Sequence, residues 1–193
     1  MSTPRPRAAR LLTAFSPKLG RTVRAFDRAG FDQWVRLEAD PGVISFCEHP
    51  CRASGEDDGP LIDFWVARRD KEEMLVVERN RDASSTHDAV QGVPVRVVPA
   101  AEQAAAAVWV SNWLRIVPVI NATRDLVPKA LPQSALRLVH KPLALSFVEH
   151  ELAAGDPSIV RGAIFELLRT DQLSAPSLHT QPLSLHTALE PRP

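Results

Sequence analysis

Long apolar runs, a signal-like N-terminus and a cysteine framework are all missing from this 193-residue sequence. No run of 18 apolar residues is present, so the sequence predicts no membrane-spanning helix and no membrane partner. The basic residues Arg5, Arg7 and Arg10 are interrupted by prolines and precede no apolar segment, a pattern that is untypical of a secretory signal. We therefore expect a cytoplasmic protein.

Cysteine occurs only twice, as Cys47 and Cys51 on either side of His49. These residues and His87 can be assembled on paper into a zinc site, but four ligands at a standard zinc spacing are absent. We expect two ordinary reduced cysteines rather than a metal site or a disulfide, in keeping with a reducing compartment.

The sequence also lacks a net charge, since 23 Lys and Arg balance 23 Asp and Glu. This balance argues against general nucleic-acid binding by a uniformly basic surface. Residues 1–24 are nevertheless basic, while the middle of the chain is acidic. A basic arm beside an acidic pocket suits a phosphate-bearing polymer, and a solvated tail without a partner is the alternative. The candidate DNA-binding residues are Lys18, Arg21 and Arg24.

Residue patterns predict a mixed α/β layer in the first ~125 residues. Apolar positions favour a helix over residues 21–39, with Gly30 in its middle. Strands are expected over residues 43–47, 61–66, 74–78 and 93–98. Residues 81–92 are expected to form a surface connection, and an alanine-rich helix is expected from residue 100 to about 121.

The C-terminal part differs in style. Three short helices are predicted over residues 132–139, 143–153 and 157–168, with Asp156 as the N-cap of the third. Residues 173–189 have the composition of a β-wing. Helix, turn, helix and wing is a DNA-binding plan. The basic face of the third helix is thin, so docking to a protein stays open as the alternative to groove binding.

Two acids are predicted at the ends of neighbouring strands. A polar turn over residues 68–73 indicates a hairpin that brings Asp63 and Glu78 side by side. Carboxylates at short range are ligands for Mg²⁺, and such an ion activates water for phosphodiester hydrolysis. The alternative is a solvent-facing charge at each strand end. We expect Asp63→Ala to leave the fold intact, whereas a loss above ~2 kcal/mol would indicate a buried, hydrogen-bonded acid.

Five segments together resemble a known family. They are Ser16-Pro17-Lys18-Leu19-Gly20-Arg21-Thr22-Val23-Arg24, Leu37-Glu38-Ala39-Asp40-Pro41-Gly42-Val43, Glu48-His49-Pro50, Ile62-Asp63-Phe64 and Val77-Glu78-Arg79-Asn80. In order and spacing they resemble, over about residues 16–98, the TnsA-type endonuclease subunits of heteromeric transposases. Members of that family cut DNA at transposon ends beside a partner DDE transposase.

The resemblance implies an α/β fold: a restriction-endonuclease-like mixed sheet with flanking helices, plus a small helical or winged-helix-like C-terminal region. The corresponding division is a basic arm over residues 1–15, an endonuclease core over 16–125 and a C-terminal region over 126–193. Mg²⁺ is the implied cofactor, with Mn²⁺ as a substitute. The implied partners are DNA and a DDE-type transposase.

Carried over by position, Asp63 falls on the family's metal-binding aspartate, and Glu78 and the main-chain carbonyl of Arg79 complete the expected ligands. Two departures are evident. The family's helix glutamate falls on Gly30, which has no side chain. Its motif lysine falls on Asn80, which donates a hydrogen bond but supplies no charge to a developing oxyanion.

Two residues are candidate substitutes for these missing groups. Asp27 lies one helical turn before Gly30 and shares its face. Lys71 could supply a cation from the turn of the hairpin. The side chain of Arg79 is a weaker candidate, because alternation along a strand directs it to the opposite face from Glu78 and Asn80.

Three functions follow from these patterns. The first is a transposon-end endonuclease subunit that hydrolyses phosphodiesters with Mg²⁺, despite the two replaced groups. The second is a catalytically inactive relative that binds DNA or docks a transposase. The third is a winged-helix DNA-binding regulator with an unrelated N-terminal domain.

Overall fold

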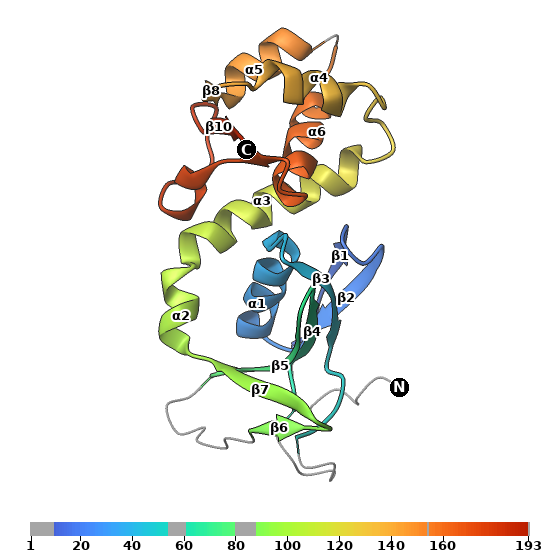
Figure 1. Ribbon diagram of the computed structural model, residues 1–193, viewed down its shortest axis with the longest axis vertical. Helices are drawn as coiled ribbons and strands as arrows, with labels where there is room; N and C mark the ends of the chain where they lie inside the picture. Colours follow the sequence, from blue (N-terminus) through green and yellow to red (C-terminus); the bar gives the residue numbers. More distant parts are fainter. Residues whose placement is uncertain (1–9, 54–60, 80–87, 154, 193) are drawn as a thin grey trace. The chain divides into compact units, whose positions relative to one another are not determined.

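The structure is a computed structural model, which describes residues 10–53, 61–79, 88–153 and 155–192 (Figure 1). The chain divides into two compact units, Met1–Ala105 and Ala106–Pro193. This division lies earlier than the boundary expected at residue 125. Among the helices of the described residues, none is both long enough and apolar enough to cross a membrane.

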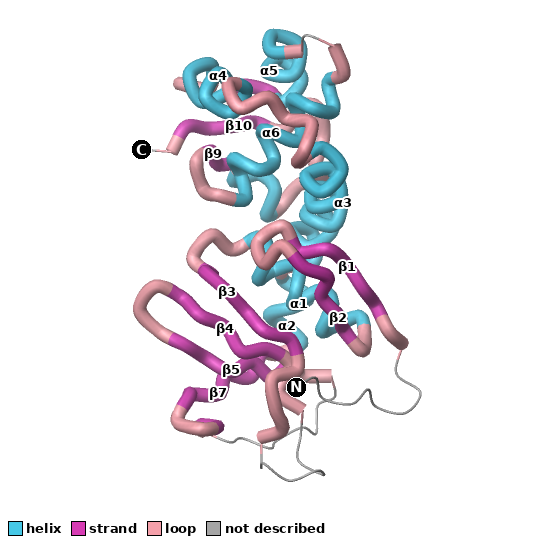
Figure 2. The backbone as a smooth tube through the Cα atoms, turned by 90° about the vertical axis from the view of Figure 1, so that its right-hand side faces the viewer, coloured by secondary structure: helices cyan, strands magenta, loops and turns pink. Residues whose placement is uncertain are grey.

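The first unit is built on a five-stranded mixed sheet with the order β3-β4-β5-β7-β6, in which only β5 and β7 pair in parallel. Figure 2 shows β3, β4, β5 and β7 side by side. The strands are β3 (Val43–Glu48), β4 (Phe64–Arg68), β5 (Glu72–Val77), β6 (Ala89–Val90) and β7 (Val93–Val98). The flanking elements are a hairpin of β1 (Leu12–Ser16) and β2 (Arg21–Ala25), then α1 (Arg28–Ala39) and, after β7, α2 (Ala100–Ala105). The expected mixed α/β class is confirmed.

The predicted hairpin around residues 68–73 is present as β4 and β5. Phe64 lies opposite Leu75 in the register, and both side chains are buried. Apolar pairs that face each other across two strands stabilise such a hairpin and fix its register. The turn closes where the N–H of Arg68 donates to the carbonyl of Lys71. This register places Asp63 immediately before β4.

The helix predicted over residues 21–39 is wrong in its first part, because Arg21–Ala25 forms β2. Val23 and Ala25 are buried between exposed neighbours, and this alternation is typical of a strand. Asp27 is the N-cap of α1, since its Oδ1 accepts a hydrogen bond from the N–H of Gly30 at 2.8 Å. Gly30 therefore lies in the first turn of the helix and not in its middle.

The turn between β1 and β2 is held on α1 by Glu38, whose side chain is fully buried. Its carboxylate accepts hydrogen bonds from the hydroxyl of Ser16 and from the N–H of Lys18. The ammonium of Lys18 donates to the carbonyls of Leu37 at 2.8 Å and Asp40 at 2.6 Å. A cation at these carbonyls complements the C-terminal end of the helix.

The second unit begins with α3 (Ala107–Thr123), so the helix expected from residue 100 to about 121 is interrupted at Ala106. Its other elements are α4 (Leu131–Leu138), β8 (Leu143–Ala144), α5 (Leu145–Leu152), α6 (Pro157–Arg169), β9 (Leu173–Ser174), the 3₁₀ helix η1 (Pro176–His179) and β10 (Ala188–Pro191). The three short strands form a sheet with the order β8-β10-β9. The three expected short helices are confirmed as α4, α5 and α6, with Asp156 capping α6 through the N–H of Ser158.

Helix α6 forms the centre of the second unit. Its buried residues are Val160, Gly162, Ala163, Ile164, Phe165, Leu167 and Leu168. At Gly162 the helix touches α3, because a Cβ placed there would lie 1.9 Å from Oγ1 of Thr123. Such a distance is far inside van der Waals contact, so the close packing of α3 on α6 depends on glycine at this position.

Candidate functional site

The candidate site lies where the N-terminus of α1 meets the start of β4 and the end of β5. Asp63 has 0% of its surface exposed, and its carboxylate Oδ2 accepts a hydrogen bond from the N–H of Val77 at 2.7 Å. Its backbone continues the sheet, since its N–H donates to Leu75 and its carbonyl accepts from His49. Asp63 is therefore a buried acid between strands and not a solvent-facing charge.

Arg79 lies between the carboxylates of Asp63 and Asp27. Its Nη2 donates to Oδ1 of Asp63 at 2.6 Å and its Nη1 donates to Oδ2 at 3.0 Å, which is the bidentate arrangement. Its Nε donates to Oδ2 of Asp27 at 2.5 Å, and Nη1 also reaches the carbonyl of Val77 at 2.8 Å. One guanidinium thus bridges α1 and the β4–β5 hairpin.

The ion pairs of Arg79 shift the pKa values of both Arg79 and Asp27. Burial alone would lower the pKa of Arg79, but the hydrogen bonds and charges of Asp63 and Asp27 outweigh it and raise that pKa. Burial alone would raise the pKa of Asp27, but the hydrogen bonds from Arg79 and Gly30 hold it below its usual value. The guanidinium is charged at every relevant pH.

Position 30 lies beside Asp27 and Arg79. A Cβ at Gly30 would lie 3.4 Å from Oδ1 of Asp27 and 3.6 Å from Nη2 of Arg79. The expectation that Asp27 shares a face with Gly30 agrees with this geometry. A larger side chain at position 30 would project toward the guanidinium.

His49 forms one wall of the site. The residue is buried and has a φ of 51°, and its ring stacks on Phe26 with a centroid distance of 4.2 Å. Burial lowers the pKa of His49, an effect that the carboxylates of Asp63, Glu48 and Asp27 oppose and Arg79 reinforces. The imidazole is therefore held neutral more strongly than in an unfolded chain.

This lowered pKa predicts acid sensitivity. The unfolded chain binds a proton at His49 near pH 6.5, whereas the folded chain binds it only at lower pH. His49 thus contributes stability above about pH 6.5 that is lost as the pH falls through the folded pKa, at up to about 1.4 kcal/mol per pH unit. Urea unfolding between pH 7.5 and 5 should show a flatter pH profile for His49→Phe. His186→Ala, at an exposed histidine, is the control, and identical slopes for all three proteins would contradict this role.

The other expected site residues lie elsewhere. Glu78 directs its carboxylate to the N–H of Ala100 at 2.9 Å, at the start of α2. Lys71 lies at the turn beyond the far end of β4, where its ammonium is 3.8 Å from Glu73. The expectation that Lys71 supplies a cation near Asp63 is therefore wrong, because the length of the hairpin separates them. Asn80 lies outside the described residues.

The direction of the Arg79 side chain is predicted wrongly by alternation along the strand. Strand β5 ends at Val77, so the two-residue period no longer governs the side chain of Arg79. Its guanidinium turns back onto Asp63 and onto the carbonyl of Val77. The available signal was an arginine two residues beyond a predicted strand, next to a strand that carries an acid.

Two of the three candidate DNA-binding residues have partners within the first unit. Lys18 caps α1, and Arg21 forms a bidentate ion pair with Glu48 in which both nitrogen–oxygen distances are 2.6 Å. Arg24 is exposed. Lys18 and Arg21 are therefore committed to contacts within the first unit.

The pair of Arg21 and Glu48 should contribute little to stability. The side chain of Arg21 is 44% exposed, and exposed ion pairs typically contribute ~0.2–1 kcal/mol. We expect Arg21→Ala to lower the free energy of unfolding by no more than about 1 kcal/mol in urea titrations. A loss several times larger would show that this pair, and not Arg79, holds the first unit together.

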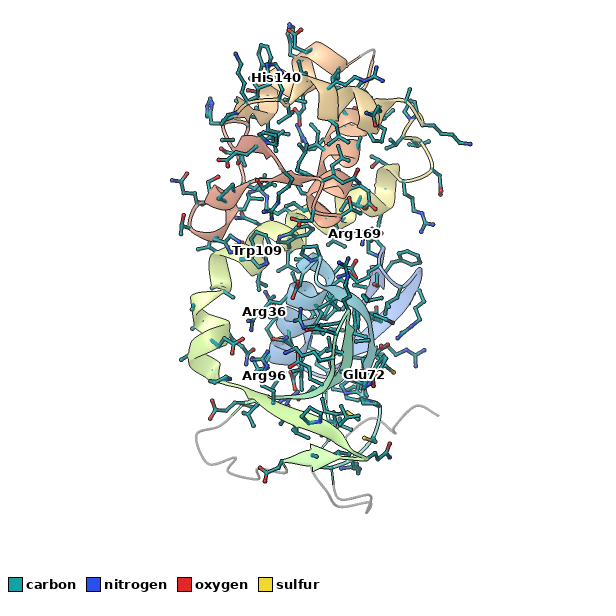
Figure 3. All side chains as sticks on the ribbon, in the orientation of Figure 1. Arg36, Glu72, Arg96, Trp109, His140 and Arg169 are labelled. Atoms are coloured by element: carbon teal, nitrogen blue, oxygen red, sulfur yellow. The ribbon has the colours of Figure 1, made fainter. Side chains whose placement is uncertain are left out.

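Other arginines of the first unit are also paired. Arg36 and Arg96, labelled in Figure 3, both contact Glu102 of α2, at 2.5 Å and 3.0 Å. Arg68 pairs with Asp40 at 2.8 Å. Ion pairs therefore connect α1 to α2 and to β4, and they neutralise cations that a DNA-binding surface would need.

The residues of this site do not fit the expected Mg²⁺ ligand set. Both carboxylate oxygens of Asp63 accept hydrogen bonds from Arg79, and Glu78 is directed to Ala100. Across the part of the chain that the structure describes, no three His, Cys, Asp or Glu side chains are arranged to hold a metal ion. The donor atoms that an ion would need are thus engaged by a cation of the chain itself.

Comparison with known proteins assigns no function to this site. No protein-family model matches the sequence, and no curated protein matches it. The likeness to TnsA-type subunits therefore rests on the five sequence segments alone. The chemistry of the site has to be argued from its own geometry.

Proposed function

We propose that this protein is a non-cutting relative of the TnsA-type endonuclease subunits and that it docks a DDE-type transposase. The observation that supports this proposal is the bidentate contact between Arg79 and Asp63. The acid that the family uses for metal binding is buried beneath an arginine of the same chain. A chain that keeps the order of the family's segments but lacks a free metal site at Asp63 can still bind the DDE-type transposase, and docking is therefore the role we infer.

Hydrolysis by a metal-activated water fits this geometry poorly. Such a reaction needs an ion on several hard oxygen ligands, with an open coordination position for water. Here Asp63 has no exposed surface, and Glu78 accepts from the start of α2. For cutting, Arg79 would have to leave Asp63 and a metal ion would have to replace it as the counter-charge of this buried carboxylate.

The fold supports the same family reading. A mixed sheet with helix α1 beside it is compatible with a restriction-endonuclease-like core. From α4 onward the second unit has the order helix, strand, helix, helix, strand, strand, with η1 between the last two strands. This order, with the sheet order β8-β10-β9, is compatible with a winged helix.

Groove binding by the second unit is the less favoured role. In a helix-turn-helix plan the second helix of the motif presents exposed side chains to base edges. Helix α6 holds this place, but most of its residues are buried. Its two arginines are paired, Arg161 with Glu149 at 2.5 Å and Arg169, labelled in Figure 3, with Glu166 at 2.5 Å. The burial of α6 and the pairing of its arginines also argue against a winged-helix DNA-binding regulator.

The proposal predicts that a DDE-type transposase gene lies beside the gene of this chain, and the purified product of that gene is the partner used in the test. Isothermal titration calorimetry should detect a stoichiometric complex of the two purified proteins in the absence of DNA. Fluorescence anisotropy with transposon-end and scrambled duplexes should show no binding by this chain alone at 150 mM salt. Asp63→Asn is the matched control, because a docking function does not need the charge of a buried acid.

Two results would contradict docking. A chain that binds duplex DNA with a steep salt dependence but does not bind the transposase has a DNA-binding role instead. The absence of any neighbouring transposase gene would remove the partner from the outset.

A further inference from the structure

Four oxygen atoms converge on the guanidinium of Arg79. They are Oδ2 of Asp27 at 2.5 Å, Oδ1 and Oδ2 of Asp63 at 2.6 Å and 3.0 Å, and the carbonyl oxygen of Val77 at 2.8 Å. Carboxylate and carbonyl oxygens are the donors that Mg²⁺ and Mn²⁺ take from proteins. Oxygen atoms suited to a divalent ion are therefore present here, but the guanidinium of Arg79 occupies the position between them.

We propose that Arg79 is a resident internal cation that takes the place of a divalent metal ion between Asp27 and Asp63 and makes this site independent of metal. The inference rests on the claim under the proposed function that the site holds no metal, and it does not depend on docking. Arg79 contacts the two carboxylates and the carbonyl of Val77, and it is a structural cation, not a catalytic residue.

The charge of the site supports this role. Two carboxylates, one of them fully buried, meet in a region lined by the rings of Phe26 and His49. Buried carboxylates need a counter-charge and hydrogen bonds to remain ionised. A planar guanidinium supplies the charge and several donors at fixed angles, which suits two carboxylates at once.

Gly30 provides a second, independent observation. Its missing Cβ would lie 3.6 Å from Nη2 of Arg79 and 3.4 Å from Oδ1 of Asp27. A long side chain at this position would enter the space in front of Asp27 and compete with the guanidinium. Glycine at position 30 and arginine at position 79 are therefore complementary, because the first leaves the room that the second occupies.

The test asks whether a metal ion binds in the place of the guanidinium when Arg79 is substituted. Thermal unfolding of the wild type, Arg79→Ala and Arg79→Gln is followed in EDTA, in Mg²⁺ and in Mn²⁺, and Mn²⁺ binding is measured by electron paramagnetic resonance. The wild type should bind no Mn²⁺ and should have the same Tm in all three buffers. Both variants should melt earlier in EDTA and should gain about 5 °C at Mn²⁺ concentrations tenfold above its Kd.

Arg21→Ala is the matched control, because Arg21 also makes a bidentate pair but with a single carboxylate, Glu48. Its Tm should not respond to Mn²⁺. Adding Asp63→Asn to Arg79→Gln should abolish the Mn²⁺ response, which locates the ion at this site. If Arg79→Ala is unfolded in every buffer, Arg79→Gln decides the test, since its amide still donates to one carboxylate.

Two results would overturn the inference. A wild-type protein that binds Mn²⁺ and melts later in its presence has a metal site that Arg79 does not replace. Variants at Arg79 that bind no Mn²⁺ show that the oxygen atoms do not form a cation site once the guanidinium is gone. Both readouts use this chain alone, so they are separate from the failure or success of transposase binding.

Discussion

Gly162→Ala is expected to destabilise the second unit by about 3 kcal/mol or more, the largest single effect we predict from an added methyl group. The new Cβ would lie 1.9 Å from Oγ1 and 2.8 Å from Cβ of Thr123. Thr123 is buried, and its hydroxyl donates to the carbonyl of Val119, so it cannot turn away without losing that hydrogen bond. Helices α3 and α6 would have to separate. Hydrogen exchange of the α3 and α6 amides measures this loss directly.

Gly155→Ala is the matched control, because nothing lies within 4 Å of a Cβ at that position. It should leave stability unchanged or raise it slightly, by less than about 1 kcal/mol. Adding Thr123→Ala to Gly162→Ala should restore only part of the stability, since the Cβ of residue 123 remains. Similar behaviour of Gly162→Ala and Gly155→Ala would contradict the close packing of the two helices.

Asp63→Ala is expected to cost about 2–3 kcal/mol, because it removes the buried carboxylate that accepts two hydrogen bonds from Arg79, although Arg79 itself is 39% exposed and keeps its contact with Asp27. The N–H of Val77 also loses its acceptor. This expectation reverses the prediction from sequence, in which Asp63 faces solvent or an ion and tolerates alanine. Equilibrium unfolding in urea, read by circular dichroism, gives the value.

Asp63→Asn separates charge from shape. Its amide oxygen still accepts from Val77, but its charge no longer balances Arg79, so the loss should be smaller than for alanine. A loss below about 1 kcal/mol for Asp63→Ala would contradict the buried ion pair. It would return Asp63 to the role of a solvent-facing acid.

Much of the fold could be predicted from local patterns. Strand β7 has the predicted bounds 93–98, and β3 extends the predicted strand by one residue, because prolines and an apolar run define them without tertiary context. Residues 21–25 were assigned to a helix because Val23 fits a helical period as well as a strand period. Only the pairing of β2 with β1 decides between them. The break at Ala106 is equally invisible, since alanine favours helix on both sides of it.

The site could be predicted in part for a related reason. Asp27 is predicted to substitute for the helix glutamate that is missing at Gly30, and the structure brings Asp27 and Asp63 to the same guanidinium. Which cation joins them depends on where β5 ends, and the boundaries of elements are the least predictable feature of a sequence. Because β5 ends at Val77, Arg79 is free of the strand alternation and reaches Asp63. Lys71 does not reach it, because it lies at the turn at the other end of the hairpin.

The central claim, that Arg79 occupies the site where a cutting enzyme would hold its metal ion, is tested most directly by nicking of supercoiled DNA in Mg²⁺ and in Mn²⁺. The wild type, Asp63→Ala and the double variant Gly30→Glu/Asn80→Lys are compared at equal folded concentration. Our account predicts no nicking by the wild type in either metal. Nicking by the wild type that disappears with Asp63→Ala would contradict it, since that result requires a metal ion where the structure places a guanidinium.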